Sequence, residues 1–248
     1  MTQFKSFALS DMGFYRKKNE DAFALIDECA FFVLADGIGG HPSGDVAAKQ
    51  AVKTLCELIK EKHVQFLKEK IHIEKIKRAF KTLIHQTNEH VFTLSQSKQL
   101  LLGMGTTLAC AYFFEEFLVY AHVGDSRIYR IRENELEQLT QDHSYVQELL
   151  DQGLISETES KKHVKRNVIT KAIGTKMHVQ PSIQLSECQE KDIYLLCSDG
   201  LHDVLTNGQM EEIINRSDDL EIAANLLINA AKRKGSRDNI TVLFIEKQ

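Results

Sequence analysis

Carboxylates stand at the ends of apolar runs in four places along this chain, and three of the four have a glycine next to them. The four residues are Asp36, Asp125, Asp199 and Asp238. A single aspartate beside a glycine is ordinary turn chemistry. Four aspartates at the junctions of four buried runs instead indicate that several strand ends bring their carboxylates together.

Carboxylates that lie close together repel one another, and a divalent cation removes that repulsion. A site with only oxygen ligands suits Mg²⁺ or Mn²⁺, whereas zinc prefers histidine and cysteine. Glycine lets the backbone approach closely, so the carbonyl of Gly37 is a further candidate ligand. Two such ions sharing one water lower its pKa and supply hydroxide at neutral pH, which is the chemistry of metal-assisted hydrolysis.

Two further residues complete a candidate hydrolytic site. Arg16 stands five residues before Asp21 in the run "RKKNEDA", and a guanidinium can hold a phosphate group through two parallel hydrogen bonds. His41 follows the first of the aspartates and could donate a proton near neutral pH. Taken alone, each is equally consistent with a plain role, Arg16 as a surface cation and His41 as a polar turn residue.

The elements that must position these residues follow from hydrophobic periodicity. Strands are expected over residues 4–9, 22–26, 30–35, 106–113, 117–123, 126–132, 193–197 and 240–245. Apolar stripes predict helices over 46–59 and 73–94, and shorter helices are expected at 145–152, 211–215 and 220–234. Neighbouring short strands usually pair antiparallel, so 106–113, 117–123 and 126–132 are expected to pair in that order. The order of elements predicts an α+β layered domain with largely antiparallel sheets.

Length and composition narrow the class of protein. The chain has 248 residues, of which 43 % are apolar, and this predicts a single domain spanning 1–248. A net charge of −4 gives no sign of nucleic-acid binding, and no run approaches the length of a membrane span. Five cysteines without a Cys-x-x-Cys pair, and no leader-like N-terminus, favour a cytoplasmic protein with buried free thiols. A monomer is the default expectation.

Seven segments, in order along nearly the whole chain, resemble the motifs of a known family. They are "GFYRKKNEDA" at 13–22, "VLADGIGGHPSGDVAA" at 33–48, "MGTTLACAY" at 104–112, "AHVGDSRIYRIRENELEQLTQDHS" at 121–144, "RNVITKAIG" at 166–174, "LLCSDGLHDVL" at 195–205 and "GSRDNITVLFI" at 235–245. In these seven segments the chain is similar to the metal-dependent PPM phosphatases, or protein phosphatase 2C-like enzymes, in their bacterial form. One motif alone would be weak, but seven in the correct order are specific.

The resemblance implies a central sandwich of two antiparallel β-sheets flanked by pairs of α-helices, in four layers. It also implies hydrolysis of phosphoserine and phosphothreonine in proteins, with no phosphoenzyme intermediate. Residues 142–180 would form a flap beside the active site, where substrate choice is partly made. The partners would be phosphorylated proteins, a bacterial Ser/Thr kinase among them.

The resemblance further implies roles for individual residues at a site with two Mn²⁺ or Mg²⁺ ions. Asp36 would bridge the two ions, the Gly37 carbonyl would bind one, and Asp199 and Asp238 would hold the other. Asp21, with Glu20 beside it as a further candidate, would act through coordinated water.

A third ion, which the bacterial members suggest, would be held by Asp125 together with Asp199. Arg16 would bind the substrate phosphate. Eukaryotic members carry a histidine directly after the Asp-Gly pair, whereas this chain has Ile38 there and a later histidine, His41, so His41 or metal-bound water is the candidate general acid.

Three other functions are weighed against this one. A catalytically inactive, phosphoprotein-binding pseudophosphatase is opposed by the intact carboxylate set. A hydrolase of small phosphate esters or phosphodiesters is disfavoured by the motifs, and comparing a phosphopeptide with free nucleotides would separate the two. A structural scaffold protein has no feature in its favour.

Overall fold

Two five-stranded antiparallel sheets make up the centre of the molecule in the computed structural model, which describes residues 4–38, 43–69 and 71–248. The first sheet has the order β1 (Phe4–Asp11), β10 (Ile240–Lys247), β9 (Ile193–Cys197), β6 (Arg127–Arg132) and β7 (Glu135–Gln138). The second has the order β2 (Asp21–Ile26), β3 (Phe31–Asp36), β4 (Leu108–Phe114), β5 (Phe117–Val123) and β8 (Ser182–Glu187).

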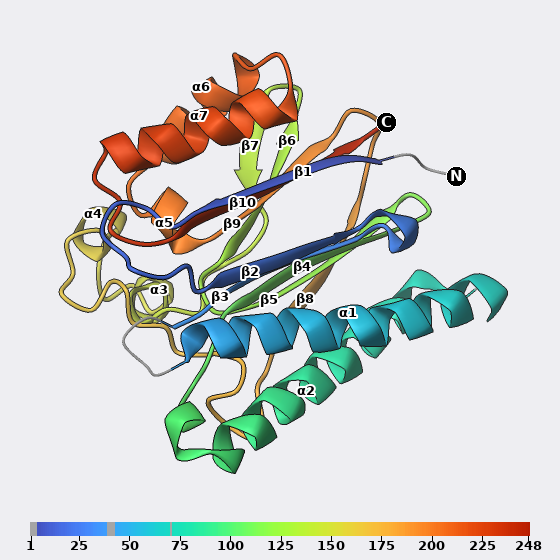
Figure 1. The fold of residues 1–248 in the computed structure, drawn as a ribbon. Coiled ribbons are helices and arrows are strands. Elements are labelled where there is room, and N and C mark those ends of the chain that lie inside the picture. The colour runs from blue at the N-terminus through green and yellow to red at the C-terminus, as the bar shows by residue number, and fades with distance from the viewer. Residues whose placement is uncertain (1–3, 39–42, 70) are drawn as a thin grey trace.

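Helices cover the outer face of each sheet, as Figure 1 shows. The second sheet is covered by α1 (Gly44–Glu69) and α2 (Ile73–Ser97), and the first by α6 (Asn207–Asn215) and α7 (Leu220–Arg233). Short elements connect these helices and strands along the chain: η1 (Asp27–Cys29), η2 (Gln99–Leu101), α3 (Tyr145–Asp151), α4 (Glu157–Ser160) and α5 (Asp199–His202). The expected α+β sandwich with a helix pair on each side is therefore confirmed.

The apolar run in β3 shows why the layers stack as they do. Phe31 and Val33 pack toward α1 and α2, while Phe32 and Leu34 pack toward the other sheet, and all four are fully buried. Successive strand side chains point to opposite faces, so a strand covered on both faces must be apolar throughout. A slip of one residue in this register would turn Asp36 to the opposite face.

Strand pairing differs from the sequence expectation after β5. The strands β4 and β5 pair antiparallel as predicted, but β6 leaves that sheet and pairs with β9 in the other one. Gly124 makes the crossing possible, because its φ of +100° is a conformation that side-chain-bearing residues rarely adopt. The expectation that three consecutive strands pair in order was therefore wrong for the third.

Two strands and part of the core were also missed. The strand β7 has a half-exposed, charged sequence, and β8 lies at a sheet edge with a polar pattern, so neither carries an apolar signal. Within 142–180, Ile173 is fully buried and forms an isolated bridge with Thr106. That segment therefore contributes to the core as well as to the surface.

All five cysteines are free and four of them are buried. Across the described ranges, no helix has the length and apolar content to cross a membrane.

Candidate active site

The pairing of β2 with β3 places two carboxylates opposite each other. Asp21, the first residue of β2, is directly across from Asp36, the last residue of β3. The backbone of Asp36 is fixed by the two residues before β4, because its N–H donates to Thr107 Oγ1 (2.9 Å) and its carbonyl accepts from the Thr106 hydroxyl (2.8 Å). The segment that leads into β4 therefore holds Asp36 in place.

Asp21 also connects the two sheets. Its Oδ2 accepts hydrogen bonds from the hydroxyls of Ser198 (3.0 Å) and Thr241 (2.5 Å), which lie at the end of β9 and the start of β10. Ser198 in turn accepts from the Thr241 N–H (3.0 Å). This network carries Asp199 and the 238–239 segment to the same end of the sandwich as Asp36.

Arg16 enters the site on the loop between β1 and β2. Its Nη2 donates to Asp238 Oδ2 at 2.5 Å. Asn239 holds the same loop, because its side chain accepts from the Glu20 N–H (2.8 Å) and donates to the carbonyls of Met12 and Lys18 (both 3.0 Å). Arg16, Asp199 and Asp238 line one pocket of about 570 Å³.

Asp125 approaches from the turn after β5. Its carbonyl accepts from the buried His202 Nε2 at 3.1 Å. Next to it, Arg127 holds Asp142 through two nitrogens, with an Nη2–Oδ2 distance of 2.7 Å and an Nε–Oδ1 distance of 2.9 Å. This ion pair ties the beginning of 142–180 to β6, beside the carboxylates.

The electrostatics of the cluster show how close the carboxylates are. Burial raises the pKa of Asp36 well above its usual range, and the charges of Asp21, Asp199, Asp238 and Asp125 raise it further. Burial likewise raises the pKa of Asp21 to about 6 and that of Asp125 to about 7. Carboxyl groups that perturb one another in this way share one confined site.

Two buried oxygens within the cluster lack any protein partner in the described structure. They are Oδ1 of Asp21 and Oδ1 of Asp199. An unpaired buried carboxylate oxygen is costly, and a cation is the partner that would satisfy it. The donor set consists of carboxylates, which fits a hard divalent ion such as Mg²⁺ or Mn²⁺.

Some of these carboxylate oxygens already accept hydrogen bonds from other side chains of the protein. Among the residues that the structure describes, no group of three or more His, Cys, Asp and Glu side chains stands ready to hold a metal ion. Arg16 engages one oxygen of Asp238, and two hydroxyls engage one oxygen of Asp21. These contacts leave Oδ1 of Asp21 and Oδ1 of Asp199 free to face an ion.

Glycines permit the close approach of backbones around the cluster. A Cβ on Gly37 would lie 2.5 Å from the backbone of Gly44 and 2.8 Å from the carbonyl oxygen of Glu20. A Cβ on Gly200 would lie 2.0 Å from the carbonyl oxygen of Asn239. Larger residues at these two positions would push apart the segments that carry the carboxylates.

Seven of the eight residues predicted from the sequence lie at one end of the two sheets. They are Arg16, Asp21, Asp36, Gly37, Asp125, Asp199 and Asp238. His41 lies outside the described residues, so its role stays a prediction.

Two residues of this region were not predicted. Asp203 lies beside Asp125 and Asp199, and its negative charge raises the pKa of both. Its only signal in the sequence is its position four residues after Asp199. Asn239 positions the Arg16 loop, and its signal is that it adjoins Asp238.

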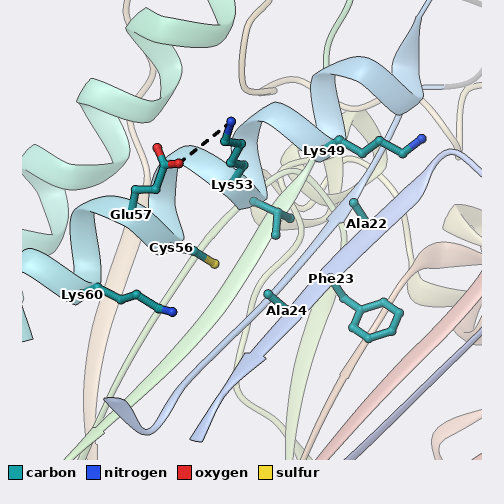
Figure 2. A pocket seen from close by; sticks show the side chains of 9 residues that line it. Ala22, Phe23, Ala24, Lys49, Lys53, Cys56, Glu57 and Lys60 are labelled. Carbon is teal, nitrogen blue, oxygen red and sulfur yellow. Dashed lines mark ion pairs between the residues drawn. The ribbon is translucent and has the colours of Figure 1, made fainter. Parts of the chain in front are cut away.

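A separate hollow lies between β2 and α1 (Figure 2). Its floor is apolar, and lysines of α1 stand around it. Lys53 pairs with Glu57 of the same helix at 4.0 Å, as Figure 2 shows. Lys60 pairs with Glu28 at 3.2 Å. None of the carboxylates of the candidate site lines this hollow, although Ala22, one of its lining residues, adjoins Asp21.

Comparison with known proteins identifies the class that this fold and this site define. The family model described as Protein phosphatase 2C matches residues 16–226. The chain therefore belongs to the protein phosphatase 2C family, and the expectation of a protein phosphatase is confirmed.

Three relatives illustrate the likeness. A serine/threonine phosphatase stp of Listeria monocytogenes serotype 4b is 37 % identical over 241 residues, which cover 96 % of this chain and 94 % of that protein. A crystal structure of a bacterial serine phosphatase superposes with a TM-score of 0.91 at 31 % identity, over 99 % of this chain and 98 % of the other. The catalytic domain of the serine/threonine protein phosphatase PstP, solved with two manganese ions, has a TM-score of 0.85 at 30 % identity and covers 100 % and 99 %.

Proposed function

We propose that this protein hydrolyses phosphoserine and phosphothreonine in other proteins at a site with two Mn²⁺ or Mg²⁺ ions. The observation that carries the proposal is the cluster of aspartates around Asp36, in which buried oxygens of Asp21 and Asp199 lack a protein partner. The two manganese ions of the PstP structure support the choice of metal.

The ligands in this proposal are Asp36, the Gly37 carbonyl, Asp199 and Asp238, with Asp21 acting through water. When bound, two divalent ions supply a hydroxide at neutral pH and offset the charge of the phosphate. Asp21 is held by the hydroxyls of Ser198 and Thr241, so its free Oδ1 has a fixed direction.

Arg16 is the proposed phosphate ligand. Its guanidinium lies in the same pocket as Asp199 and Asp238, and its bond to Asp238 holds it at the rim of the carboxylate cluster. When substrate enters, nitrogens of the same fork bind phosphate oxygens, which places the phosphorus beside the carboxylates. His41 is proposed to protonate the serine or threonine oxygen as it leaves.

A third ion is proposed between Asp125 and Asp199. Burial raises the pKa of Asp199, and Asp125 and Asp203 are the next causes, so these three carboxylates share one corner of the site. Asp203 thereby becomes a further candidate ligand for this third ion.

The proposal also covers the domain organisation, location and partners of the protein. The 248 residues form one catalytic domain, in which 142–180 is a flap beside the site, tied to β6 by the ion pair between Arg127 and Asp142. The protein acts in the cytoplasm as a monomer and opposes a bacterial Ser/Thr kinase. Phosphorylated proteins are its substrates, in keeping with the names of its relatives.

The first experiment measures phosphate release from a phosphothreonine peptide with Mn²⁺, with Mg²⁺ and with EDTA. We expect metal-dependent turnover in the wild type and a loss of at least about 100-fold in Asp199→Ala, because removing a ligand removes several kcal/mol of transition-state stabilisation.

Turnover that survives both EDTA and Asp199→Ala would reject the carboxylate site. No turnover, combined with thermal stabilisation by Mn²⁺, would favour the phosphoprotein-binding pseudophosphatase. Hydrolysis of free nucleotides in preference to the peptide would favour a small-ester hydrolase.

A further inference from the structure

The pocket that contains the candidate phosphate ligand is lined by three aspartates, Asp199, Asp203 and Asp238, and by as many arginines. Three arginines are among its lining residues: Arg16, Arg166 and Arg237. Arg16 is engaged by Asp238. Burial raises the pKa of Asp203, and the charge of Arg166 opposes that rise, so Arg166 lies beside this carboxylate.

Arg237 differs from the other two arginines. Within the described ranges, no carboxylate lies at ion-pair distance from its guanidinium. It is an exposed side chain between two well-fixed neighbours: Ser236 is buried and donates to the Gly200 carbonyl (2.8 Å), and Asp238 receives the Arg16 bond. The backbone at this position is therefore held firmly, while the exposed Arg237 side chain lines the pocket with no carboxylate partner among the described residues.

An aromatic side chain supports the Arg237 guanidinium. Its central carbon lies 6.0 Å from the centre of the Tyr15 ring, within the range of a cation–π contact. Tyr15 precedes Arg16 in the chain and is 62 % exposed. The contact therefore joins the second cation of the pocket to the loop that carries the first.

The loop itself is fixed, although its aromatic side chains are exposed. Gly13 has a φ of +74°, and a Cβ there would lie 2.6 Å from the Asp238 carbonyl oxygen, so the loop packs directly against the segment that carries Arg237. Lys232 anchors its start, because its Nζ pairs with Asp11 (2.9 Å) and lies 4.6 Å from the Phe14 ring centre. Such preorganisation lowers the cost of binding.

We propose that Arg237, supported by Tyr15, forms a second anion subsite that recognises another negative charge on the substrate near the phosphorylated residue. The inference rests on the proposed function and extends it to the choice of substrate. The anion is the carboxylate of an acidic side chain or a second phosphate group, since a guanidinium binds both through two parallel hydrogen bonds.

The pocket has more room than one phosphate group fills. A phosphate group fills the space of a few water molecules, each about 30 Å³. The pocket of about 570 Å³ therefore also admits a neighbouring side chain of the substrate.

The test uses phosphothreonine peptides of equal length that differ at one nearby position, which holds Gln, Glu or a second phosphothreonine. The readout is the ratio of kcat/KM for each charged peptide to that for the Gln peptide, because a ratio cancels any general loss of activity. We expect wild-type ratios of about three to five, the size of a single exposed ion pair, carried mainly by KM. Arg237→Ala should lower the ratio to about one, and 0.5 M salt should lower it in the wild type.

Matched variants separate a subsite from a general charge effect. Arg233→Ala removes the same charge from the exposed end of α7, outside the pocket, and should keep the wild-type ratio. Tyr15→Leu should lower the ratio, whereas Tyr15→Phe, which keeps the ring, should preserve it. A Glu ratio above one with no response to the second phosphate identifies a carboxylate subsite, and the reverse identifies a phosphate subsite.

A wild-type ratio of one for both charged peptides would overturn the proposal, and so would equal losses in Arg237→Ala and Arg233→Ala. If the wild type hydrolyses none of the peptides, the proposed function fails instead. In that case fluorescence anisotropy with the same labelled peptides still decides the subsite: tighter binding of a charged peptide that is lost in Arg237→Ala supports it, and equal binding rejects it.

Discussion

At the scale of single residues, the site depends on close contacts between backbones as much as on its carboxylates. Gly200 follows Asp199 and lies against the carbonyl oxygen of Asn239, with no room for a side chain between them. That contact sets the distance between the segment after β9 and the segment before β10, each of which carries a proposed ligand. Steric exclusion at one glycine thus controls the geometry of two aspartates.

Replacing this glycine is expected to be costly. A Cβ 2.0 Å from a carbonyl oxygen forces the backbone to move, so Gly200→Ala should lower the free energy of unfolding by about 2–4 kcal/mol and reduce phosphatase activity. Urea unfolding followed by circular dichroism measures the first effect. Gly208→Ala is the matched control, because nothing lies within 4 Å of its added Cβ. It should be neutral or stabilise α6 by up to about 1 kcal/mol, and equal costs at both positions would contradict the steric argument.

At the scale of elements, two stacked histidines join the second sheet to the start of 142–180. The rings of His122 on β5 and His143 have centres 4.4 Å apart and an interplanar angle of 13°. His143 accepts from the Gly124 N–H (3.2 Å) and bonds Ser182 of β8 through Nε2 (2.9 Å). A neutral ring satisfies both bonds, because one nitrogen accepts while the other donates.

This arrangement predicts a loss of stability in acid. Burial, together with the charge of His122, lowers the pKa of His143 to about 3, whereas an unfolded histidine titrates near 6.5. Between about pH 6.5 and pH 3 the unfolded chain binds a proton that the folded chain does not, so this contribution to stability is present above 6.5 and lost as the pH falls. Unfolding free energies at several pH values should show a shallower loss in His143→Gln than in the wild type, by up to about 1.4 kcal/mol per pH unit. Parallel profiles would show that His143 is not the group responsible.

At the scale of the whole molecule, the two sheets bring their aspartates together at one end of the sandwich. Each sheet has its own helix pair and its own apolar layer, and the third apolar cluster lies between the sheets. The aspartates therefore gather where the two halves join, and a cation placed there would bind both halves at once. Metal binding should accordingly stabilise the fold as a whole.

The size of this stabilisation should depend on pH. Burial raises the pKa of Asp21 to about 6 and that of Asp125 to about 7, against about 3.9 for an unfolded aspartate. Between about pH 4 and pH 7 the metal-free folded chain holds the extra protons, so this contribution to its stability falls as the pH rises. Divalent ions relieve the ionised carboxylates, so the rise in Tm on adding Mn²⁺ should be larger at pH 7.5 than at pH 5.

Differential scanning fluorimetry in EDTA and in Mn²⁺ checks this expectation. Asp199→Asn provides the control, because it removes one buried charge from the cluster. The variant should melt higher than the wild type in EDTA at pH 7.5 and should lose most of the Mn²⁺ shift. A rise in Tm of the same size at both pH values, or one that persists in Asp199→Asn, would mean that the ion binds elsewhere.

Much of this protein is determined by local sequence. Apolar runs of a few residues predict strands because a strand buried on both faces must be apolar, as in β3, and the stripes of α1 and α2 follow the helical repeat. Seven motifs in order indicate the family. The sequence also shows directly that three of the four strand-end aspartates stand beside a glycine. The strands β7 and β8 were missed because half-exposed edge strands carry polar residues and leave no apolar pattern.

Only the tertiary structure decided which strand ends meet. Asp21 and Asp36 are opposite each other because β2 and β3 pair in one register, and Asp21 reaches Ser198 and Thr241 because the second sheet packs on the first. No local signal shows that β6 leaves its neighbour, that Asn239 secures the Arg16 loop or that Arg237 lies over Tyr15. These contacts join residues up to 227 positions apart. They form because of the packing free energy of the whole fold, so no short stretch of sequence predicts them.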